Sequence, residues 1–244
     1  MSETVIQVTS LGKRIKGKTI LEDISFEINR GDCVALIGPN GAGKTVLMSC
    51  ILGDKKPSSG QVLIDGKAGK AKNKIAVLLQ ENTIPNSLKV EELIAFFQSI
   101  SDNPLTNQEV QDLLQFKEDQ YQQFADKLSG GQRRLLAFVL CLIDKPKILF
   151  LDEPTAGMDT STRQRFWEIV NDLKKSGTTI LYSSHYIEEV EHTADRILVL
   201  HQGKLIRDTT PHAMRSEEKE KQVTLASRFV PSIDKLAAIY EVTE

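Results

Sequence analysis

Cys33-Val-Ala-Leu-Ile37, followed at once by Gly38-Pro-Asn-Gly-Ala-Gly-Lys-Thr45, decides the fold of this chain. The first five residues form a short β-rich run, and residues 44–52 read as a helix that Gly53 ends. A glycine-rich loop between a strand and a helix turns successive amide N–H groups inward, where they hold phosphate oxygens at the positive end of the helix dipole. This spacing in this context predicts a phosphate-binding loop.

Two side chains of the loop have distinct predicted roles. Lys44 is expected to bridge the β- and γ-phosphates of a nucleotide, and the Thr45 hydroxyl is expected to ligate Mg²⁺. The loop positions predicted to bind the nucleotide are Gly38, Pro39, Asn40, Gly41, Ala42, Gly43, Lys44 and Thr45. The alternative is a glycine-rich turn with a chance lysine, which the flanking strand and helix disfavour.

An acidic pair ends the continuous apolar run of residues 147–151, which predicts a strand of the parallel-sheet type. Asp152 and Glu153 should therefore emerge at a carboxyl edge of the sheet, where open α/β sheets bind ligands. Asp152 would hold Mg²⁺ directly or through water. Glu153 would orient or deprotonate the attacking water, because phosphoryl transfer depends mainly on positioning. The alternative is a solvated acidic turn before Pro154.

A second glycine-rich stretch, Ser129-Gly130-Gly131-Gln132, follows Leu128. Ser129 resembles the N-cap of a buried helix over residues 130–143. The two glycines leave backbone N–H groups bare, which is another anion-binding geometry. Since Lys44 already has a phosphate, these donors can complete a site on another copy of the chain. A purely structural cap is the alternative.

The bulk composition excludes several classes of protein. A net charge of −2, from 31 basic and 33 acidic residues, gives no whole-chain attraction for nucleic acid, and no nucleic-acid partner is expected. Cys33, Cys50 and Cys141 have neither metal nor disulfide spacing, which predicts core positions in a reducing compartment. The longest apolar run, residues 135–143, is too short to span a bilayer. Any link to a membrane must then come through a partner.

These patterns predict an α/β fold with a P-loop NTPase core, in which helices cover a mixed sheet. Residues 1–82 and 128–210 are expected to form this nucleotide-binding core, beginning with an antiparallel β part. Residues 83–127 are glutamine-rich and helical, and they predict an inserted helical subdomain. Residues 211–244 are expected to form a short C-terminal tail.

The individual elements follow from periodicity and turn residues. Asn103-Pro104 separates the two helices of the insert, and Gln202-Gly203 is expected to turn one strand into the next. The strands predicted are residues 5–8, 20–28, 33–37, 61–65, 75–79, 147–151, 178–184, 196–200 and 204–207, with a lysine-rich turn joining 61–65 to 75–79. The helices predicted are residues 44–52, 90–99, 108–116, 130–143 and 160–175.

The order of these motifs resembles the ATP-binding subunit of an ABC (ATP-binding cassette) transporter, over about residues 5–208. By this resemblance Gln80 matches the Q-loop, which reaches the metal and the water and senses the membrane partner. Asp159, in Ala156-Gly-Met-Asp159, matches the D-loop between two protomers. His185, after Ser183-Ser184, matches the switch histidine that contacts the γ-phosphate. On their residue types alone these three positions say little.

Two positions depart from the family pattern. An aromatic residue usually stacks on adenine, and counting by the local pattern puts Ile15 at that position. Base–aromatic stacking is worth about 1–3 kcal/mol, so base binding is expected to be weaker or less selective. Val46 stands where a second hydroxyl residue usually reaches the α-phosphate, and one hydrogen bond of about 0.5–1.5 kcal/mol would be lost. All catalytic residues of the pattern are present, which predicts a competent ATPase.

The resemblance implies an ATPase that uses ATP and Mg²⁺, in which two cassettes sandwich two ATP molecules. Its partners would be a second ABC ATPase chain, identical or paralogous, and a separate transmembrane permease. The location would be cytoplasmic, peripheral on the inner face of the cell membrane. Arg133-Arg134-Leu135 and the short insert favour an export-type cassette. An importer cassette, or a soluble ABC ATPase that acts on ribosomes or DNA, remains an alternative.

Overall fold

The computed structural model describes residues 3–68, 75–80, 84–85 and 87–217. The chain divides into two compact units, Met1–Pro211 and His212–Glu244. Of the second unit, only residues 212–217 are described, and they belong to α8 (Pro211–Glu217). The rest of the predicted C-terminal tail lies outside the described residues.

The first sheet is antiparallel and has the strand order β2-β1-β4-β5. Its strands are β1 (Thr4–Ile15), β2 (Lys18–Asn29), β4 (Ser59–Ile64) and β5 (Lys67–Ala68). Strand β1 extends beyond the predicted residues 5–8. Its pairing register with β2 shifts between Val8 and Leu11 and again near Lys13, so the later part of the strand does not continue the sequence alternation of the first part. Such irregularities break the alternation on which a sequence-based prediction depends.

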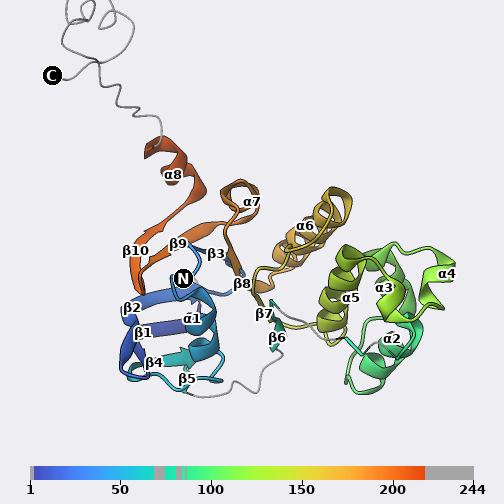
Figure 1. Cartoon of the computed structure of the whole chain (residues 1–244), viewed down its shortest axis with the longest axis horizontal. Helices are drawn as coiled ribbons and strands as arrows, with labels where there is room; N and C mark the ends of the chain where they lie inside the picture. Colours follow the sequence, from blue (N-terminus) through green and yellow to red (C-terminus); the bar gives the residue numbers. More distant parts are fainter. Residues whose placement is uncertain (1–2, 69–74, 81–83, 86, 218–244) are drawn as a thin grey trace, which may run out of the picture. The chain divides into compact units, whose positions relative to one another are not determined.

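The second sheet has six strands in the order β10-β9-β3-β8-β7-β6 (Figure 1). Its strands are β3 (Cys33–Ile37), β6 (Ile75–Leu78), β7 (Ile148–Leu151), β8 (Thr179–Ser184), β9 (Arg196–His201) and β10 (Lys204–Thr209). All neighbours are parallel except β9 and β10. Strands β3, β7 and β8 are buried along their whole length, which explains their continuous apolar sequences. The predicted mixed α/β fold is confirmed.

Tight hairpins in both sheets use the same turn chemistry. Lys16-Gly17, Asp65-Gly66 and Gln202-Gly203 each place two consecutive residues at positive φ, as a two-residue turn matched to strand twist requires. The Gln202-Gly203 turn between β9 and β10 was predicted, and it is confirmed. The Asp65-Gly66 turn corrects another prediction. Strand β4 returns through it to β5 in the antiparallel sheet, whereas β6 pairs with β7, so a single turn does not join β4 to β6. Most of the lysine-rich segment, residues 69–74, lies outside the described residues.

Helix α1 (Lys44–Ile51) packs in the core that the two sheets share. Its Leu47, Met48 and Ile51 are buried together with residues of both sheets, such as Ile24 and Val34. Cys33 and Cys50 are buried free thiols, and Cys141 is a half-buried one. Burial raises the pKa of Cys33 to about 12 and that of Cys141 to about 11. Such thiols remain protonated and unreactive, as expected of apolar filler.

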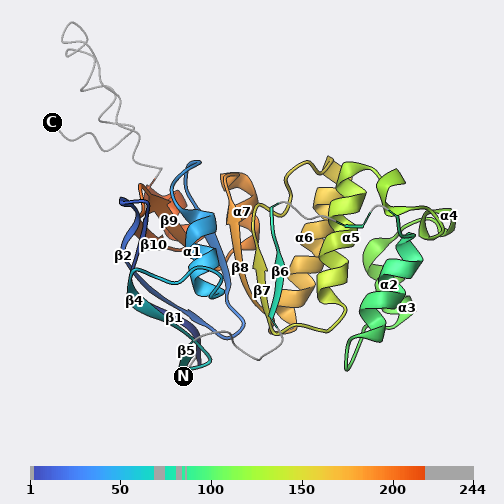
Figure 2. The ribbon, with the colours of Figure 1, turned by 60° about the horizontal axis from the view of Figure 1, so that its bottom comes forward.

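Helices α2 to α6 lie beside the β6 end of the six-stranded sheet, whereas α7 packs on β3 and β8 (Figures 1 and 2). Both views place α5 and α6 next to each other, with α2, α3 and α4 on the far side of α5 from the sheet. The helices are α2 (Val90–Ser99), α3 (Asn107–Leu114), α4 (Glu118–Tyr121), η1 (Ala125–Lys127), α5 (Gly130–Leu142), α6 (Thr160–Lys175) and α7 (Ile187–Thr193). The short helices α4 and α7 were not predicted, because neither is long enough to establish a helical period.

Candidate active site

The loop between β3 and α1 has a backbone that only glycine permits at two positions. Gly38 has φ +155°, and a Cβ there would lie 2.1 Å from the carbonyl oxygen of Leu200. Gly43, the N-cap of α1, has φ +107°, and its Cβ would lie 2.8 Å from Leu21 Cδ2. The amide of Gly203 donates to the Ala42 carbonyl at 3.0 Å. The loop is therefore held tightly against β2 and the β9–β10 turn.

Lys44, the first residue of α1, points back across this loop. Its side chain is only 7% exposed, and Nζ donates to the Gly38 carbonyl at 2.8 Å. The same ammonium lies 3.5 Å from Glu153 Oε1, in a buried ion pair. Thr45 and the loop tip, residues 39–41, are exposed. The loop thus presents bare backbone and one hydroxyl to solvent around a buried positive charge.

Glu153 follows β7, and its side chain contacts residues from α1 and from the segment after β8. Its Oε2 lies 2.6 Å from Nδ1 of His185, which follows β8, while its Oε1 faces Lys44. The backbone of Glu153 has φ +45°, a left-handed conformation that residues with a side chain adopt infrequently. The fold thus brings together the predicted residues Lys44, Glu153 and His185, which are far apart in the sequence.

Ser183 fixes the end of β7 from the neighbouring strand. Its Oγ accepts a hydrogen bond from the Glu153 amide at 2.9 Å and donates to Asp152 Oδ1 at 2.5 Å. Asp152 is also buried, and its amide donates to the Leu78 carbonyl at 2.8 Å. In the sequence analysis, Ser183 served only to mark the position of His185 and was given no role of its own. Its role as a support for both carboxyl residues becomes visible once β7 and β8 are paired.

Ser129 is the N-cap of α5, as predicted from the sequence. Its Oγ accepts from the Gln132 amide at 3.2 Å, and Gln132 Oε1 accepts from the Ser129 amide at 3.1 Å, which completes a capping box. The two glycines that follow have different surroundings. A Cβ at Gly130 would meet nothing within 4 Å, whereas one at Gly131 would lie 3.1 Å from Asp159 Oδ2.

Asp159 caps the next long helix. Its carboxylate accepts hydrogen bonds from the Thr162 amide at 3.0 Å, from Thr162 Oγ1 at 2.7 Å and from Ser161 Oγ at 2.7 Å. These bonds, that from the Thr162 amide first, hold the pKa of Asp159 well below its usual range. The loop before α6 is therefore fixed next to the start of α5, which explains why residue 131 has to be small.

Three further predicted residues, Gln80, Ile15 and Val46, also lie outside the Lys44–Glu153–His185 cluster. Gln80 follows β6 and is exposed, and it is the Gln80 carbonyl, not the side chain, that accepts a hydrogen bond from Arg134. Ile15 ends β1, where it pairs with Lys18 across the hairpin and is 37% exposed. Val46 packs against the hydrophobic core from α1. A valine is therefore well suited to its position whether or not it touches a nucleotide.

The contacts of two groups of charged residues near the site were not predicted from the sequence. Arg134 of α5 donates hydrogen bonds to five backbone carbonyls at the ends of β6 and β7. Arg163 of α6 forms an ion pair with Glu189 of α7 at 3.4 Å, and its guanidinium lies 5.5 Å from the ring centre of Tyr186. For Arg134, the sequence offered one indication of a buried role, namely a charged residue at the start of an otherwise apolar helix. Arg163 and Glu189 lie on amphipathic patterns that gave no such signal.

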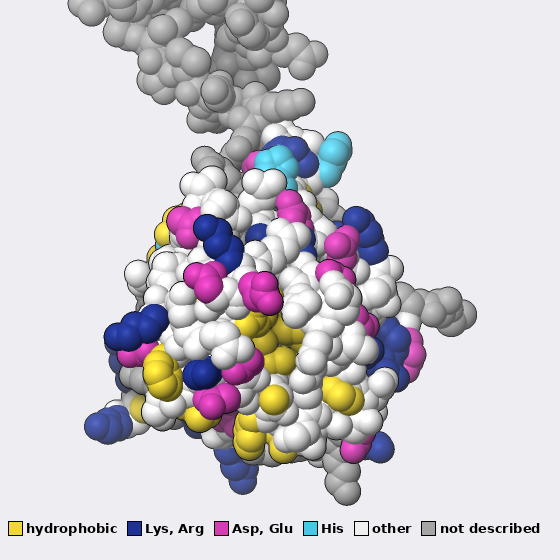
Figure 3. All heavy atoms as spheres, turned by 90° about the vertical axis from the view of Figure 1, so that its right-hand side faces the viewer, with side chains coloured by type: hydrophobic (Ala, Val, Ile, Leu, Met, Phe, Trp, Pro, Cys, Tyr) yellow, Lys and Arg dark blue, Asp and Glu magenta, His cyan; other side chains and the backbone are white. Residues whose placement is uncertain are grey.

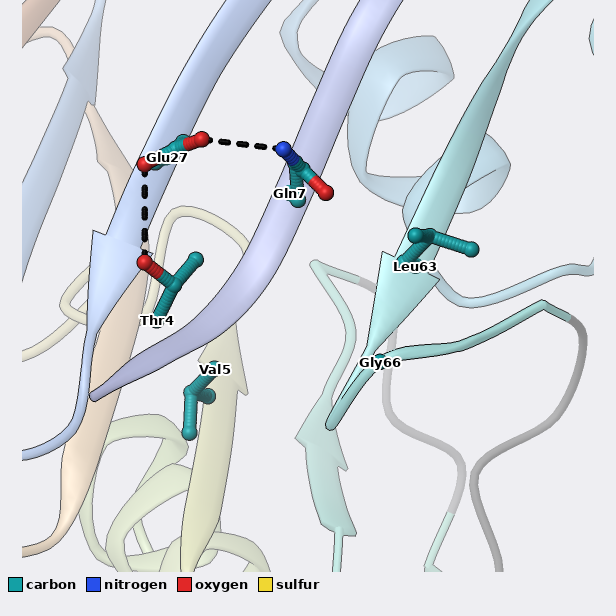
Figure 4. Close-up of a pocket in the computed structure, with 6 residues that line it drawn as sticks. All are labelled: Thr4, Val5, Gln7, Glu27, Leu63 and Gly66. Atoms are coloured by element: carbon teal, nitrogen blue, oxygen red, sulfur yellow. Dashed lines mark hydrogen bonds between the residues drawn. The ribbon is translucent and has the colours of Figure 1, made fainter.

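A small hollow of about 110 Å³ lies on the antiparallel sheet (Figure 4). It is lined by Thr4, Val5, Gln7, Glu27, Leu63 and Gly66. Its charged group, Glu27, is exposed and already accepts from Gln7 Nε2 at 2.9 Å. A negatively charged hollow does not suit phosphates, and none of the predicted site residues lines it.

Comparison with known proteins identifies the family. A family model described as "ABC transporter" matches residues 21–156, which include the phosphate loop, the segment of residues 128–132 and the acidic pair. The chain belongs to the ABC transporter family. It is 34% identical over 228 residues to the Nod factor export ATP-binding protein I of Ralstonia nicotianae, which covers 89% of this chain and 70% of that protein.

Two further similarities agree with this assignment. Over 243 residues the chain is 31% identical to the probable multidrug ABC transporter ATP-binding protein YbhF of Escherichia coli, covering 95% of the chain but only 42% of that protein. A solved structure of the ATP-binding subunit of an ABC transporter superposes with a TM-score of 0.77 at 26% identity, covering 93% of this chain and 98% of that one. The chain is thus an ATP-binding cassette of a family of ATPases. Across the described part of the chain, no helix has both the length and the apolar character needed to cross a bilayer.

Proposed function

We propose that this chain is the ATP-hydrolysing subunit of an ABC transporter, in which ATP-driven closure of two cassettes powers export through a separate membrane permease. The observation that carries the hydrolytic part is the cluster of Lys44, Glu153 and His185 beside the phosphate loop. It joins a buried cation, a carboxylate and an imidazole, which are the groups that phosphoryl transfer to water uses for positioning and charge stabilisation.

In this proposal Lys44 and the loop amides hold the phosphates of ATP. Glu153 accepts a proton from the attacking water or orients it, and His185 both fixes that carboxylate and approaches the terminal phosphate. Mg²⁺ would be held by Thr45, Asp152 and Gln80, which supply only one carboxylate. This set fits a cation that is usually bound by one or two carboxylates together with substrate phosphates and several waters. When bound, Mg²⁺ would neutralise charge on the phosphate oxygens.

The dimer part of the proposal rests on the start of α5. Gly130 faces open space, Ser129 is exposed, and the helix presents its first amides there. We infer that the phosphates of an ATP held by a second chain occupy this space, and that Asp159 lies at the contact between the two chains. The second chain is identical or paralogous. The exposed Ile15 would lie against the adenine ring.

Adding one methyl group at either glycine tests the dimer part. Gly130→Ala is expected to leave the thermal unfolding midpoint and the ATP affinity of the monomer unchanged, yet to weaken ATP-dependent dimerisation, because its Cβ would meet only the nucleotide of the partner chain. Gly131→Ala is the matched control, since its Cβ lies against Asp159 and Met158 of the same chain and should lower the unfolding midpoint. Thermal unfolding and analytical ultracentrifugation with ATP measure both effects. Normal dimerisation of Gly130→Ala would contradict this part of the proposal.

The permease part rests on the helical side of the first unit. We propose that residues 83–127 form a helical subdomain, inserted between core segments 1–82 and 128–210, that faces the membrane. Figure 3 shows the face on which α2 and α4 lie, where hydrophobic side chains gather with acidic ones around them. Phe96 of α2 and Ile100, the residue that follows this helix, are 55% and 64% exposed. Exposed apolar groups of this kind with a charged rim are typical of protein–protein contacts.

The names of the similar proteins support export as the direction of transport. One is a Nod factor export protein and another a probable multidrug transporter protein. We therefore propose a peripheral location on the cytoplasmic face of the membrane, with the permease providing the path for the substrate.

The permease part is tested by capturing the partner. Tagged Glu153→Gln chain, which should stall with ATP bound, is purified from detergent-solubilised membranes of its own cell with and without ATP. We expect mass spectrometry to find a protein with several membrane spans. This protein should co-purify with the Glu153→Gln chain but be lost when Phe96→Asp and Ile100→Asp are added to that chain. Recovery of ribosomal proteins or DNA in its place would overturn the transporter assignment and favour a soluble ABC ATPase.

A further inference from the structure

Arg134 makes the most extensive set of side-chain hydrogen bonds described near the site. The side chain belongs to the second turn of α5 and is buried, with only 8% of the residue exposed. Its five N–H groups are all used. Nε donates to Pro154 O, Nη1 to Leu79 O and Gln80 O, and Nη2 to Asp152 O and Glu153 O, at distances between 2.5 and 3.3 Å.

These partners are unusual for a buried guanidinium. Among the described residues, Arg134 forms no ion pair with a carboxylate, and its charge is balanced by carbonyl dipoles. Burial lowers the pKa of Arg134, so the protein bears a desolvation cost for keeping this charge inside. Arginine fits because its planar fork reaches five oxygens at once, whereas the three donors of a lysine ammonium diverge from a single atom.

The five carbonyls belong to the ends of two adjacent strands. Leu79 and Gln80 follow β6, and residues 152–154 follow β7. Glu153 itself has the strained φ of +45°, and its position is fixed from both sides. Ser183 binds its amide, while Arg134 binds its carbonyl and the carbonyls of its two neighbours. A strained backbone persists only where surrounding contacts determine it in this way.

Arg134 also lies on the helix that starts at Ser129. One helical turn, about 6 Å of rise, separates Gly130 from Arg134. A displacement of the start of α5 is therefore carried to the guanidinium by a rigid, hydrogen-bonded segment, and from there to the backbone of Glu153 and Gln80.

We propose that Arg134 is a positioning residue that couples the two half-sites of one chain, so that a partner's nucleotide at Ser129–Gly131 sets the position of Glu153 over the chain's own nucleotide. The inference rests on the dimer proposed above. This coupling gives a role to the hydrogen bond between the Glu153 carbonyl and Arg134 of α5. Glu153 is the residue proposed to act on water, and the start of α5 is proposed to bind the other ATP. Hydrolysis at one site then depends on occupancy of the other.

The test compares Arg134→Gln and Arg134→Lys with Arg165→Gln. Arg165 is a matched control because it also donates to backbone carbonyls, those of Leu113 and Asp112, but joins α6 to α3 away from the strand ends. ATP turnover is measured against ATP concentration, and ATP affinity of the monomer is measured by calorimetry. For Arg134→Gln we expect kcat to fall about 10²-fold, as for misplacement of a reacting group by about 1 Å. The Hill coefficient should fall toward one, with monomer ATP affinity unchanged within about twofold.

Arg134→Lys keeps the charge but not the fork, so it should fold and yet show the same loss of cooperativity with a smaller loss of kcat. It also serves if Arg134→Gln does not fold. Arg165→Gln should keep the wild-type kcat and Hill coefficient. The inference is overturned if both Arg134 variants retain wild-type cooperativity, or if kcat falls only in parallel with monomer ATP affinity. If the wild-type chain itself neither dimerises with ATP nor hydrolyses it cooperatively, the proposed dimer fails and this inference fails with it.

Discussion

Glu153→Gln is expected to lower ATP turnover by about 10²- to 10⁴-fold, the range typical of a general base or acid. The substituted amide retains the size of the side chain and can still reach Lys44 and His185, so the cluster keeps its shape. It cannot accept a proton from water. ATP binding should therefore persist, and closed dimers should accumulate with ATP.

Two measurements separate this outcome from a loss of folding. Phosphate release gives the turnover, and calorimetry gives the ATP affinity, which should remain within about threefold of the wild-type value. Glu168→Gln is the matched control, because Glu168 is half exposed on α6 and contacts Arg165 and Gln164 of the same helix. Turnover of Glu153→Gln equal to that of the wild-type chain would show that Glu153 is not the residue acting on water.

Lys44→Met is expected to impair binding itself. Charged hydrogen bonds contribute about 1.5–3 kcal/mol each, so removal of the ammonium should weaken ATP binding roughly 10- to 150-fold. The loss should be larger for ATP than for AMP, because Lys44 is predicted to contact the β- and γ-phosphates and not the base. Turnover should fall below that of Glu153→Gln, since both the phosphates and the carboxylate lose their cation.

Calorimetry with ATP and with AMP measures this difference, and thermal unfolding shows whether the variant folds. Lys175→Met provides the control, because Lys175 is 78% exposed and forms a surface ion pair with Asp172, one turn away on the same helix. An equal loss of affinity for ATP and AMP would contradict the assignment of Lys44 to the terminal phosphates.

Features that depend on neighbouring residues in the sequence were predictable. The phosphate loop, the Ser129 cap and the acidic end of β7 each carry their own local chemistry, and the structure has the expected elements around them. Helices α2 and α6 have the predicted bounds, because their periodicity is strong and turn or capping residues flank them.

Features that depend on tertiary pairing were not predictable. The full length of β1 is hidden by register shifts that only its partner strands reveal. The carbonyl contacts of Arg134 span 55 positions in the sequence, and backbone carbonyls carry no sequence signal. The Arg163–Glu189 pair likewise joins α6 to α7, and α7 is too short to be recognised from its pattern.

The strand order β3-β8-β7-β6 places the site residues at distances from the phosphate loop that do not follow their order in the sequence. Adjacent strands lie about 4.8 Å apart, so the end of β8, with His185, is one step from the phosphate loop, Glu153 two steps, and Gln80 three steps or roughly 14 Å. In the sequence, by contrast, Gln80 follows the loop first and His185 last. The residues along this edge thus form a graded series. In the function proposed above, Gln80 would therefore reach the phosphates from the outermost of these strands, where its carbonyl also accepts a hydrogen bond from Arg134 of α5.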